Sequence, residues 1–120
     1  MKPARRIAHR FLDILEAIDD IRDLLNGETL ETFRGNRFKR PAAERLLEII
    51  SEASRYVPDA VKSSHSGVPW RKVAGLGNIL RHAYHETNPA ILWDIYENYL
   101  SQLEDAIRAA QPDYPDVDGG

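Results

Sequence analysis

Apolar residues recur at three- and four-residue steps along most of this 120-residue chain, the spacing that places them on one face of an α-helix. The first segment of this kind runs from about residue 4 to residue 26, and Gly27 follows it where a helix C-cap glycine would lie. Its apolar positions are Ile7, Phe11, Ile14, Leu15, Ile18, Ile21 and Leu25. The pattern predicts a long amphipathic first helix.

The next apolar stripe predicts a second long helix over about residues 36–55. Pro41 falls within it, so the helix either begins near Arg40 with the proline in its first turn or is kinked at the proline. Two shorter helical segments are expected on either side of this helix, one around residues 30–33 and one over residues 58–62.

Two more helices are predicted towards the C-terminus, the third over residues 70–84 and the fourth over residues 89–110. Asn88 and Pro89 mark the start of the fourth helix, because asparagine is a favoured N-cap and proline suits the first helical position. Residues 111–120 contain Pro, Asp and Gly without periodicity, and we expect them to form a flexible tail.

Four amphipathic helices joined by short loops predict an all-α fold, an antiparallel bundle of four main helices with short additional helical turns. We find no strand pattern and no internal repeat. The length suits one domain with one core, which we place at residues 1–110.

Composition excludes several classes of function. The net charge of −3 and pI of about 5.8 argue against binding nucleic acid by overall charge, so any such contact must be local. Without cysteine the chain has neither disulfides nor a thiol nucleophile. No apolar run approaches the length of a membrane span, and the N-terminal segment lacks the apolar core of a signal peptide, so we expect a cytoplasmic protein.

The third predicted helix ends in a dense group of polar side chains. Asn78, Arg81, His82 and His85 crowd one face, opposite an apolar face made of Val73, Leu76, Ile79, Leu80 and Ala83. A cation, an amide and two imidazoles side by side suit an anionic ligand such as a phosphate, and histidine titrates near neutral pH. The alternative is a solvated helix end, where Arg and His bind the last carbonyl groups and oppose the helix dipole.

The chain resembles a known family, the HepT-like toxins of the HEPN superfamily. The resemblance covers residues 5–108 and rests on the segments LLNG, LEIISEA, VPWRKVAGLGNILRHAYHETN and ILWDIYENYL. Family members share an Arg, four further residues, His, one residue and Tyr, with a polar residue after the Arg. His82, Tyr84 and Asn78 match the His, the Tyr and the polar residue, while Gly77 stands at the position of the arginine.

Helix geometry offers a substitute for that arginine. Arg81 lies one turn after Gly77, and side chains on a helix lean towards its N-terminus, so the Arg81 guanidinium should lie over the turn that Gly77 occupies. Two alternatives stay open. Gly75 and Gly77 permit close approach of another helix, or Arg81 is an ordinary exposed residue.

The resemblance implies metal-independent cleavage of RNA without a cofactor. His82 would act as general acid or base, Arg81 would stabilise charge on the phosphate, and Asn78 and His85 would contact the substrate. Two copies of the motif would face each other across a homodimer cleft. A metal site is the competing interpretation, but His82 and His85 would need a third ligand, and Glu86 lies about 100° around the helix from His85.

The tyrosine of the motif carries a further implication. In the family it is the residue that a partner nucleotidyltransferase antitoxin modifies with AMP, which here would be Tyr84. From the residues alone Tyr84 is better explained as a tyrosine at the rim of the core. The resemblance therefore implies a ribonuclease toxin silenced by adenylylation, and the alternative is a catalytically weakened HEPN module that binds RNA, nucleotide or a protein partner without cutting.

Overall fold

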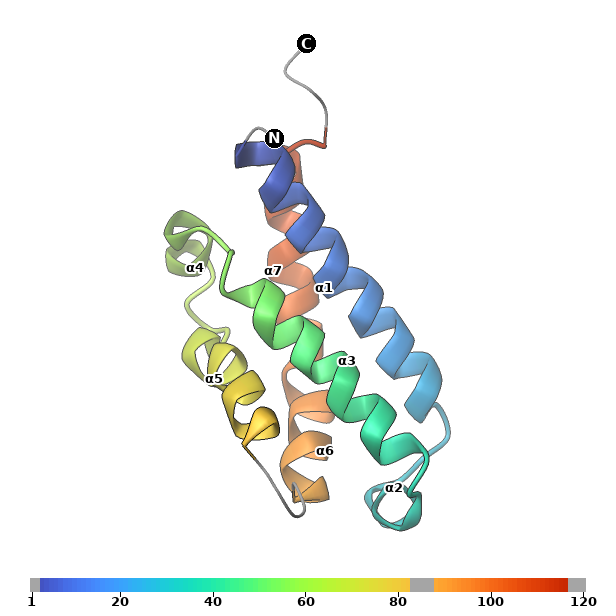
Figure 1. The fold of residues 1–120 in the computed structure, drawn as a ribbon. Coiled ribbons are helices and arrows are strands. Elements are labelled where there is room, and N and C mark those ends of the chain that lie inside the picture. The colour runs from blue at the N-terminus through green and yellow to red at the C-terminus, as the bar shows by residue number, and fades with distance from the viewer. Residues whose placement is uncertain (1–2, 83–87, 117–120) are drawn as a thin grey trace.

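A computed structural model describes residues 3–82 and 88–116 of the chain (Figure 1). These residues form helices and contain no strand, which confirms the all-α prediction. The helices are α1 (Pro3–Leu25), α2 (Leu30–Gly35), α3 (Lys39–Ser54), α4 (Asp59–Ser64), α5 (Trp70–Arg81), α6 (Pro89–Asn98) and α7 (Leu100–Ala110), followed by a short 3-10 helix, η1 (Gln111–Asp113).

The four main parts of the bundle are α1, α3, α5 and the consecutive pair α6 and α7. Helix α3 lies between α1 and α5, and α7 packs against α1 (Figure 1). Helix α2 closes one end of the bundle by packing on α6, where the rings of Phe33 and Trp93 lie 5.7 Å apart. The start of α1 and the end of α7 lie at the opposite end of the bundle.

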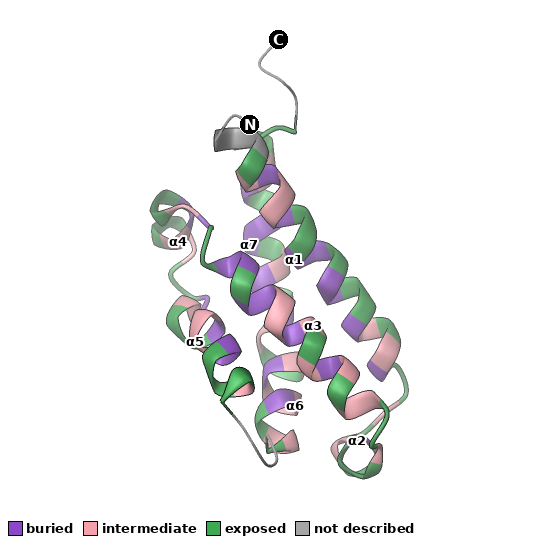
Figure 2. Cartoon of the chain, in the orientation of Figure 1, coloured by how far each residue is buried: buried purple, intermediate pink, exposed green. Residues whose placement is uncertain are grey.

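One continuous core fills the bundle. Figure 2 shows its buried residues along the inner faces of the long helices, with exposed residues on the outer faces. Helix α1 contributes the fully buried side chains Phe11, Ile14, Ile18 and Ile21, as its apolar spacing predicts. No helix in the described ranges is long and apolar enough to cross a membrane.

The start of α3 settles one of the alternatives left by the sequence. The helix begins at Lys39, so Pro41 lies in its first turn and causes no kink. The Asn36 side chain accepts hydrogen bonds from the backbone N–H groups of Phe38 (3.1 Å) and Lys39 (2.9 Å). This side chain satisfies donors that have no partner inside a helix.

The fourth predicted helix is divided in the structure. Helix α6 ends at Asn98, Tyr99 adopts φ −119° and ψ −22°, and α7 begins at Leu100. The reason lies in packing, because α6 lies against α2 and α3 whereas α7 lies against α1. A change of direction at Tyr99 lets one apolar stripe follow different neighbours.

The described part of the chain continues beyond residue 110, where we placed the end of the domain. After η1, the Tyr114 ring packs edge to face against Phe11, with ring centroids 5.6 Å apart. His9 Nε2 lies 3.1 Å from a carboxylate oxygen of Asp116. The tail segment through residue 116 is therefore held against the first half of α1.

Candidate functional site

Helix α5 carries the described part of the predicted site. It ends at Arg81, before the predicted end at residue 84, and His82 is its C-cap residue, donating its backbone N–H to the carbonyl of Asn78 (3.2 Å). Asn78, Arg81 and His82 are all exposed. Tyr84 and His85, predicted as the modification site and a substrate contact, lie outside the described residues.

A buried hydroxyl joins α5 to α3. Ser51 is 1% exposed; its Oγ donates to the carbonyl of Ala74 (2.9 Å) and accepts from the backbone N–H of Gly77 (2.8 Å). Arg55, one turn further along α3, donates to the same Ala74 carbonyl at 3.4 Å. Positions that ascend along α3 therefore meet positions that descend along α5, and the two helices run antiparallel, as Figure 1 shows.

Gly77 lies at a close approach between these helices. A Cβ atom added there would lie 2.9 Å from Ser51 Oγ and 3.2 Å from Nη1 of Arg81. The Arg81 guanidinium thus lies back over the turn of Gly77, as helix geometry predicts. The close-approach interpretation holds as well for Gly77, but not for Gly75, where an added Cβ would meet nothing within 4 Å.

The apolar face of α5 is narrower than predicted. Val73 and Leu76 are buried, but Leu80 is only half-buried and Ile79 is 52% exposed, so the assignment of Ile79 to the buried face was wrong for the single chain. Helix α5 packs mainly against α3, and one neighbour covers a narrower stripe than two. An uncovered isoleucine consequently lies one turn before His82.

Sequence reasoning missed two charged residues of α3 that lie on the same side of this helix as Ser51. Arg40, Glu44 and Ser51 share one face of α3, because steps of seven and eleven residues return to nearly the same direction on a helix. Since α3 and α5 are antiparallel, positions before Ser51 lie towards the end of α5 that carries Arg81. In sequence, Arg40 and Glu44 resemble any charged pair on a solvated helix.

Their surroundings in the structure are less ordinary. Burial raises the pKa of the Glu44 carboxyl above its usual value, and the charge of Arg40 partly opposes that shift. The Arg40 Nε is buried without a hydrogen-bond partner in the described part of the chain. A half-buried carboxyl and a guanidinium therefore lie on the α3 face that leads to the polar end of α5.

The Arg81 guanidinium is available to a ligand. Within residues 3–82 and 88–116, no hydrogen bond or ion pair engages it, so it does not bind the carbonyl groups at the end of α5. In the same ranges no group of three His, Asp or Glu side chains is close enough to hold a metal ion. An exposed cation beside an imidazole fits an anionic group such as a phosphate diester.

Comparison with known proteins gives one consistent family. The family model described as "Ribonuclease HepT-like" matches residues 14–110. A candidate RNase of Methanocaldococcus jannaschii is 34% identical over 102 residues, covering 84% of this chain and 94% of that protein. The "Probable ribonuclease HepT" of Thermococcus cleftensis is 34% identical over 92 residues, covering 77% and 84% respectively.

A candidate RNase of Caldanaerobacter subterraneus subsp. tengcongensis is 30% identical over 95 residues, covering 79% of this chain and 85% of that protein. No solved structure gives a significant match. The region matched by the family model spans the helices from the middle of α1 to the end of α7, and it includes Gly77, Arg81 and His82.

Proposed function

This chain belongs to the HepT-like ribonuclease family, and on that premise we propose that it is a metal-independent endoribonuclease whose active residues are Arg81 and His82. The observation that carries the proposal is the place of the Arg81 guanidinium, 3.2 Å from where a side chain at Gly77 would begin. The family motif has its arginine at that turn. Arg81 supplies the same charge from one turn further along the helix.

The chemistry follows from the residue types. One His82 imidazole takes the proton of a 2′-hydroxyl, the 2′-oxygen attacks the neighbouring phosphorus, and the bond to the 5′-oxygen breaks. A second imidazole, supplied by a second copy of the chain, donates a proton to the leaving 5′-oxygen. Arg81 stabilises the negative charge that builds on the phosphate, and Asn78 and His85 contact the strand.

A homodimer is part of this proposal. Arg81 and His82 are exposed in the single chain, next to an isoleucine, Ile79, that is 52% exposed. Burying Ile79 against a second copy would remove apolar surface from water and bring two His82 residues to one cleft. Light scattering should show a dimer, and a monomer at high micromolar concentration would contradict this arrangement.

The control of activity is proposed at Tyr84. A nucleotidyltransferase antitoxin would attach AMP to its hydroxyl, and the added phosphate would pair with Arg81 in the place of the RNA phosphate. Mass spectrometry of the chain co-expressed with a neighbouring nucleotidyltransferase should find one AMP on Tyr84. Equal silencing of wild type and Tyr84→Phe would instead indicate inhibition by complex formation alone.

The alternative function is a HEPN module that binds RNA, nucleotide or a protein partner without cutting. The specific observation in its favour is the glycine at the motif arginine position. Restoring that arginine by Gly77→Arg does not test it cleanly, because a Cβ there would lie 2.9 Å from Ser51 Oγ. The ribonuclease activity of the wild-type chain therefore decides between the two functions.

The test is cleavage of labelled single-stranded RNA, with EDTA present, by protein shown by mass to carry no AMP. His82→Ala should abolish cutting, and Arg81→Ala should cost about 2–4 kcal/mol of transition-state stabilisation. Arg71→Ala is the matched control, since it removes an exposed arginine from the other end of α5. A wild-type chain that binds RNA and leaves it intact would favour the alternative.

A further inference from the structure

We propose that the corner between α2 and α3 is a contact surface for single-stranded RNA. This corner is formed by Arg34, Arg37 and Phe38, and is called the α2–α3 corner below. The Phe38 ring would stack on one base while the two arginines bind neighbouring phosphates. The inference rests on the proposed function, because it assigns a second contact to the same RNA strand.

The exposure of Phe38 is the first observation. Its side chain is 77% exposed, more than any other large apolar residue in the described part of the chain. The guanidinium carbon of Arg37 lies 5.2 Å from the centre of the ring. An aromatic face in water beside an arginine is the combination that binds an unpaired base by stacking and its phosphate by charge.

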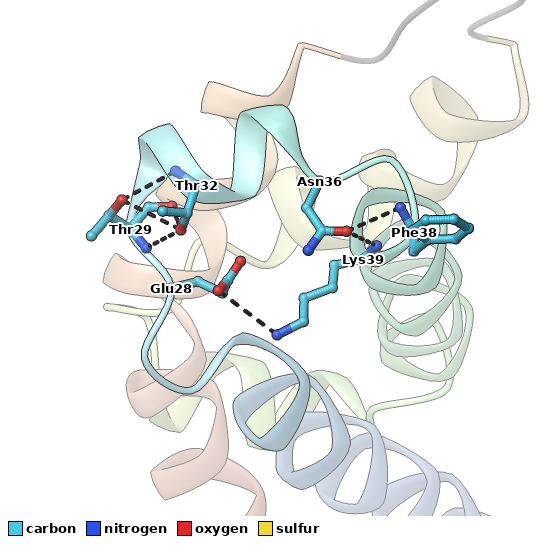
Figure 3. Close-up of polar contacts among 6 residues, drawn as sticks. All are labelled: Glu28, Thr29, Thr32, Asn36, Phe38 and Lys39. Atoms are coloured by element: carbon cyan, nitrogen blue, oxygen red, sulfur yellow. Dashed lines mark hydrogen bonds and ion pairs between the residues drawn. The ribbon is translucent and has the colours of Figure 1, made fainter.

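Hydrogen bonds, an ion pair and a capping box hold the α2–α3 corner in place, which favours a binding role for its exposed Phe38 ring. Asn36 Oδ1 accepts hydrogen bonds from the N–H groups of Phe38 and Lys39, and Figure 3 shows both bonds. Lys39 Nζ lies 3.8 Å from a carboxylate oxygen of Glu28. A capping box at Thr29 fixes the start of α2. A preformed surface loses little conformational entropy when a strand binds.

The local charge of the corner also suits RNA. Residues 34–40 contain Arg34, Arg37, Lys39 and Arg40 and no acidic residue, in a chain whose net charge is −3. Lys39 is paired with Glu28, whereas within the described ranges Arg34 and Arg37 are exposed and form no ion pair. A local cationic surface is what nucleic-acid binding requires when the overall charge is unfavourable.

The position of the corner connects it to the proposed catalytic residues. Helix α2, the first turn of α3 and the end of α5 all lie towards the same end of the bundle, away from the chain termini (Figure 1). Extending the Ser51–Gly77 contact by one turn places Arg81 near Glu48, which is roughly 15 Å along α3 from Phe38. A few nucleotides span that distance.

Charge favours RNA over a second copy of the chain as the occupant. Two copies that met through this corner would bring their arginines together and repel each other. A phosphate backbone complements those charges, and the same strand supplies a base for the phenyl ring. RNA is therefore the ligand that uses both features of the corner at once.

The test uses the full chain carrying His82→Ala, so that RNA is bound without being cut, and follows a fluorescent single-stranded oligoribonucleotide by anisotropy. Adding Phe38→Ala should weaken binding about 5- to 150-fold, the range for losing one stacked base. Phe38→Trp should preserve binding. Leu12→Ala, which truncates another partly exposed apolar residue, should change it less than about twofold.

The contribution of the arginines is measured by the salt dependence of RNA binding. Arg34→Ala should reduce the slope of log Kd against log salt concentration by about 0.7, the value for one phosphate contact to a single strand. Arg71→Ala is the matched control, because it removes one exposed arginine from the start of α5, away from the corner. Phe38→Ala should leave the slope unchanged.

The outcomes separate this inference from the proposed function. Unchanged binding by Phe38→Ala, or no binding by the His82→Ala parent, would overturn the RNA surface even if the wild-type chain cuts RNA. Phe38-dependent binding by a wild-type chain that never cuts would support the surface and contradict the ribonuclease. If Phe38→Ala leaves binding intact but dissociates an oligomer in light scattering, the corner is a protein interface and the inference is wrong.

Discussion

Helix α3 packs against α1 and α5 through contacts that differ in their chemistry. Towards α1 it meets a helix whose inner face is Phe11, Ile14, Ile18 and Ile21, all 0% exposed. Towards α5 a serine hydroxyl meets the turn of a glycine, with hydrogen bonds of 2.9 and 2.8 Å to the opposing backbone. The contact with α1 consists of large apolar side chains, whereas the contact with α5 adds short directional polar bonds beside the buried Val73 and Leu76.

The two contacts of α3 have different roles: the contact with α1 stabilises the bundle, and the polar contact positions α5. Burial of apolar surface is strong but non-directional, so the contact with α1 stabilises the bundle without defining a site. Hydrogen bonds from Ser51 hold α5 at one register, and the small size of Gly77 leaves room for the Arg81 guanidinium. The proposed active residues therefore lie on the helix whose register depends on polar bonds.

The largest expected effect is on the apolar contact. Ile18→Ala should lower the free energy of unfolding by about 2–5 kcal/mol, since it removes a fully buried aliphatic side chain and leaves a cavity. Chemical denaturation measures the change. Ile91→Ala, at a position 42% exposed, is the control and should cost under about 1 kcal/mol. RNA cleavage by still-folded Ile18→Ala should match wild type; a large loss would show that α1 also positions the site.

Breaking the polar contact should cost less stability but more activity. Ser51→Ala removes two hydrogen bonds to backbone groups of α5, and we expect a loss of about 1–3 kcal/mol in unfolding free energy. Cleavage should fall more than stability alone explains, because Arg81 is no longer held in place. Ser54→Ala is the matched control, since its buried hydroxyl donates within α3 to the carbonyl of Ser51 (2.6 Å). Equal activity of the two variants would contradict a positioning role.

Gly75 and Gly77 of α5 extend this comparison, because only Gly77 has atoms of α3 close to it. Gly75→Ala should stabilise the fold by about 0.5–1 kcal/mol, because alanine favours a helix and nothing lies near its Cβ. Gly77→Ala should destabilise by about 1 kcal/mol and reduce cleavage, because its Cβ would displace Ser51 Oγ and Arg81 Nη1. In thermal and chemical unfolding, Ser51→Ala should relieve part of the Gly77→Ala penalty, and strictly additive losses would exclude the clash.

The smallest expected effects concern two carboxyls on different sides of the molecule. A hydrogen bond from Arg22 (2.8 Å), with help from Arg108, lowers the pKa of Glu104, so its stabilisation is present above the ordinary value of 4.5 and is lost as pH falls through the lowered pKa. Glu104→Gln should therefore destabilise by about 0.5–1 kcal/mol at neutral pH and have no effect once the carboxyl is protonated.

Glu44 should respond in the opposite sense. Burial raises its pKa, so the folded chain holds the proton more tightly than the unfolded chain, and stability declines as pH rises through the window above 4.5. Glu44→Gln should stabilise the protein at neutral pH and leave it unchanged well below pH 4.5. Unfolding of both variants measured across pH 3–8 checks the pair, and parallel curves would show that the two environments do not differ.

The sequence by itself determined the features that depend on neighbours along the chain. Helix spacing predicted the all-α class, the length of α1 and the start of α6 at Asn88 and Pro89. The same local geometry predicted that Arg81 lies over Gly77, because residues four apart meet on any helix. These relations repeat every turn, so periodicity reveals them.

Only the tertiary structure decided which of these helices meet and through which atoms. The division at Tyr99 depends on α6 and α7 having different neighbours, and the exposure of Ile79 depends on how much of α5 is covered. The hydrogen bonds of Ser51 to α5 join residues more than twenty positions apart, so no local pattern predicts them. Sequence periodicity describes one helix at a time, whereas contacts between helices depend on the shapes of both.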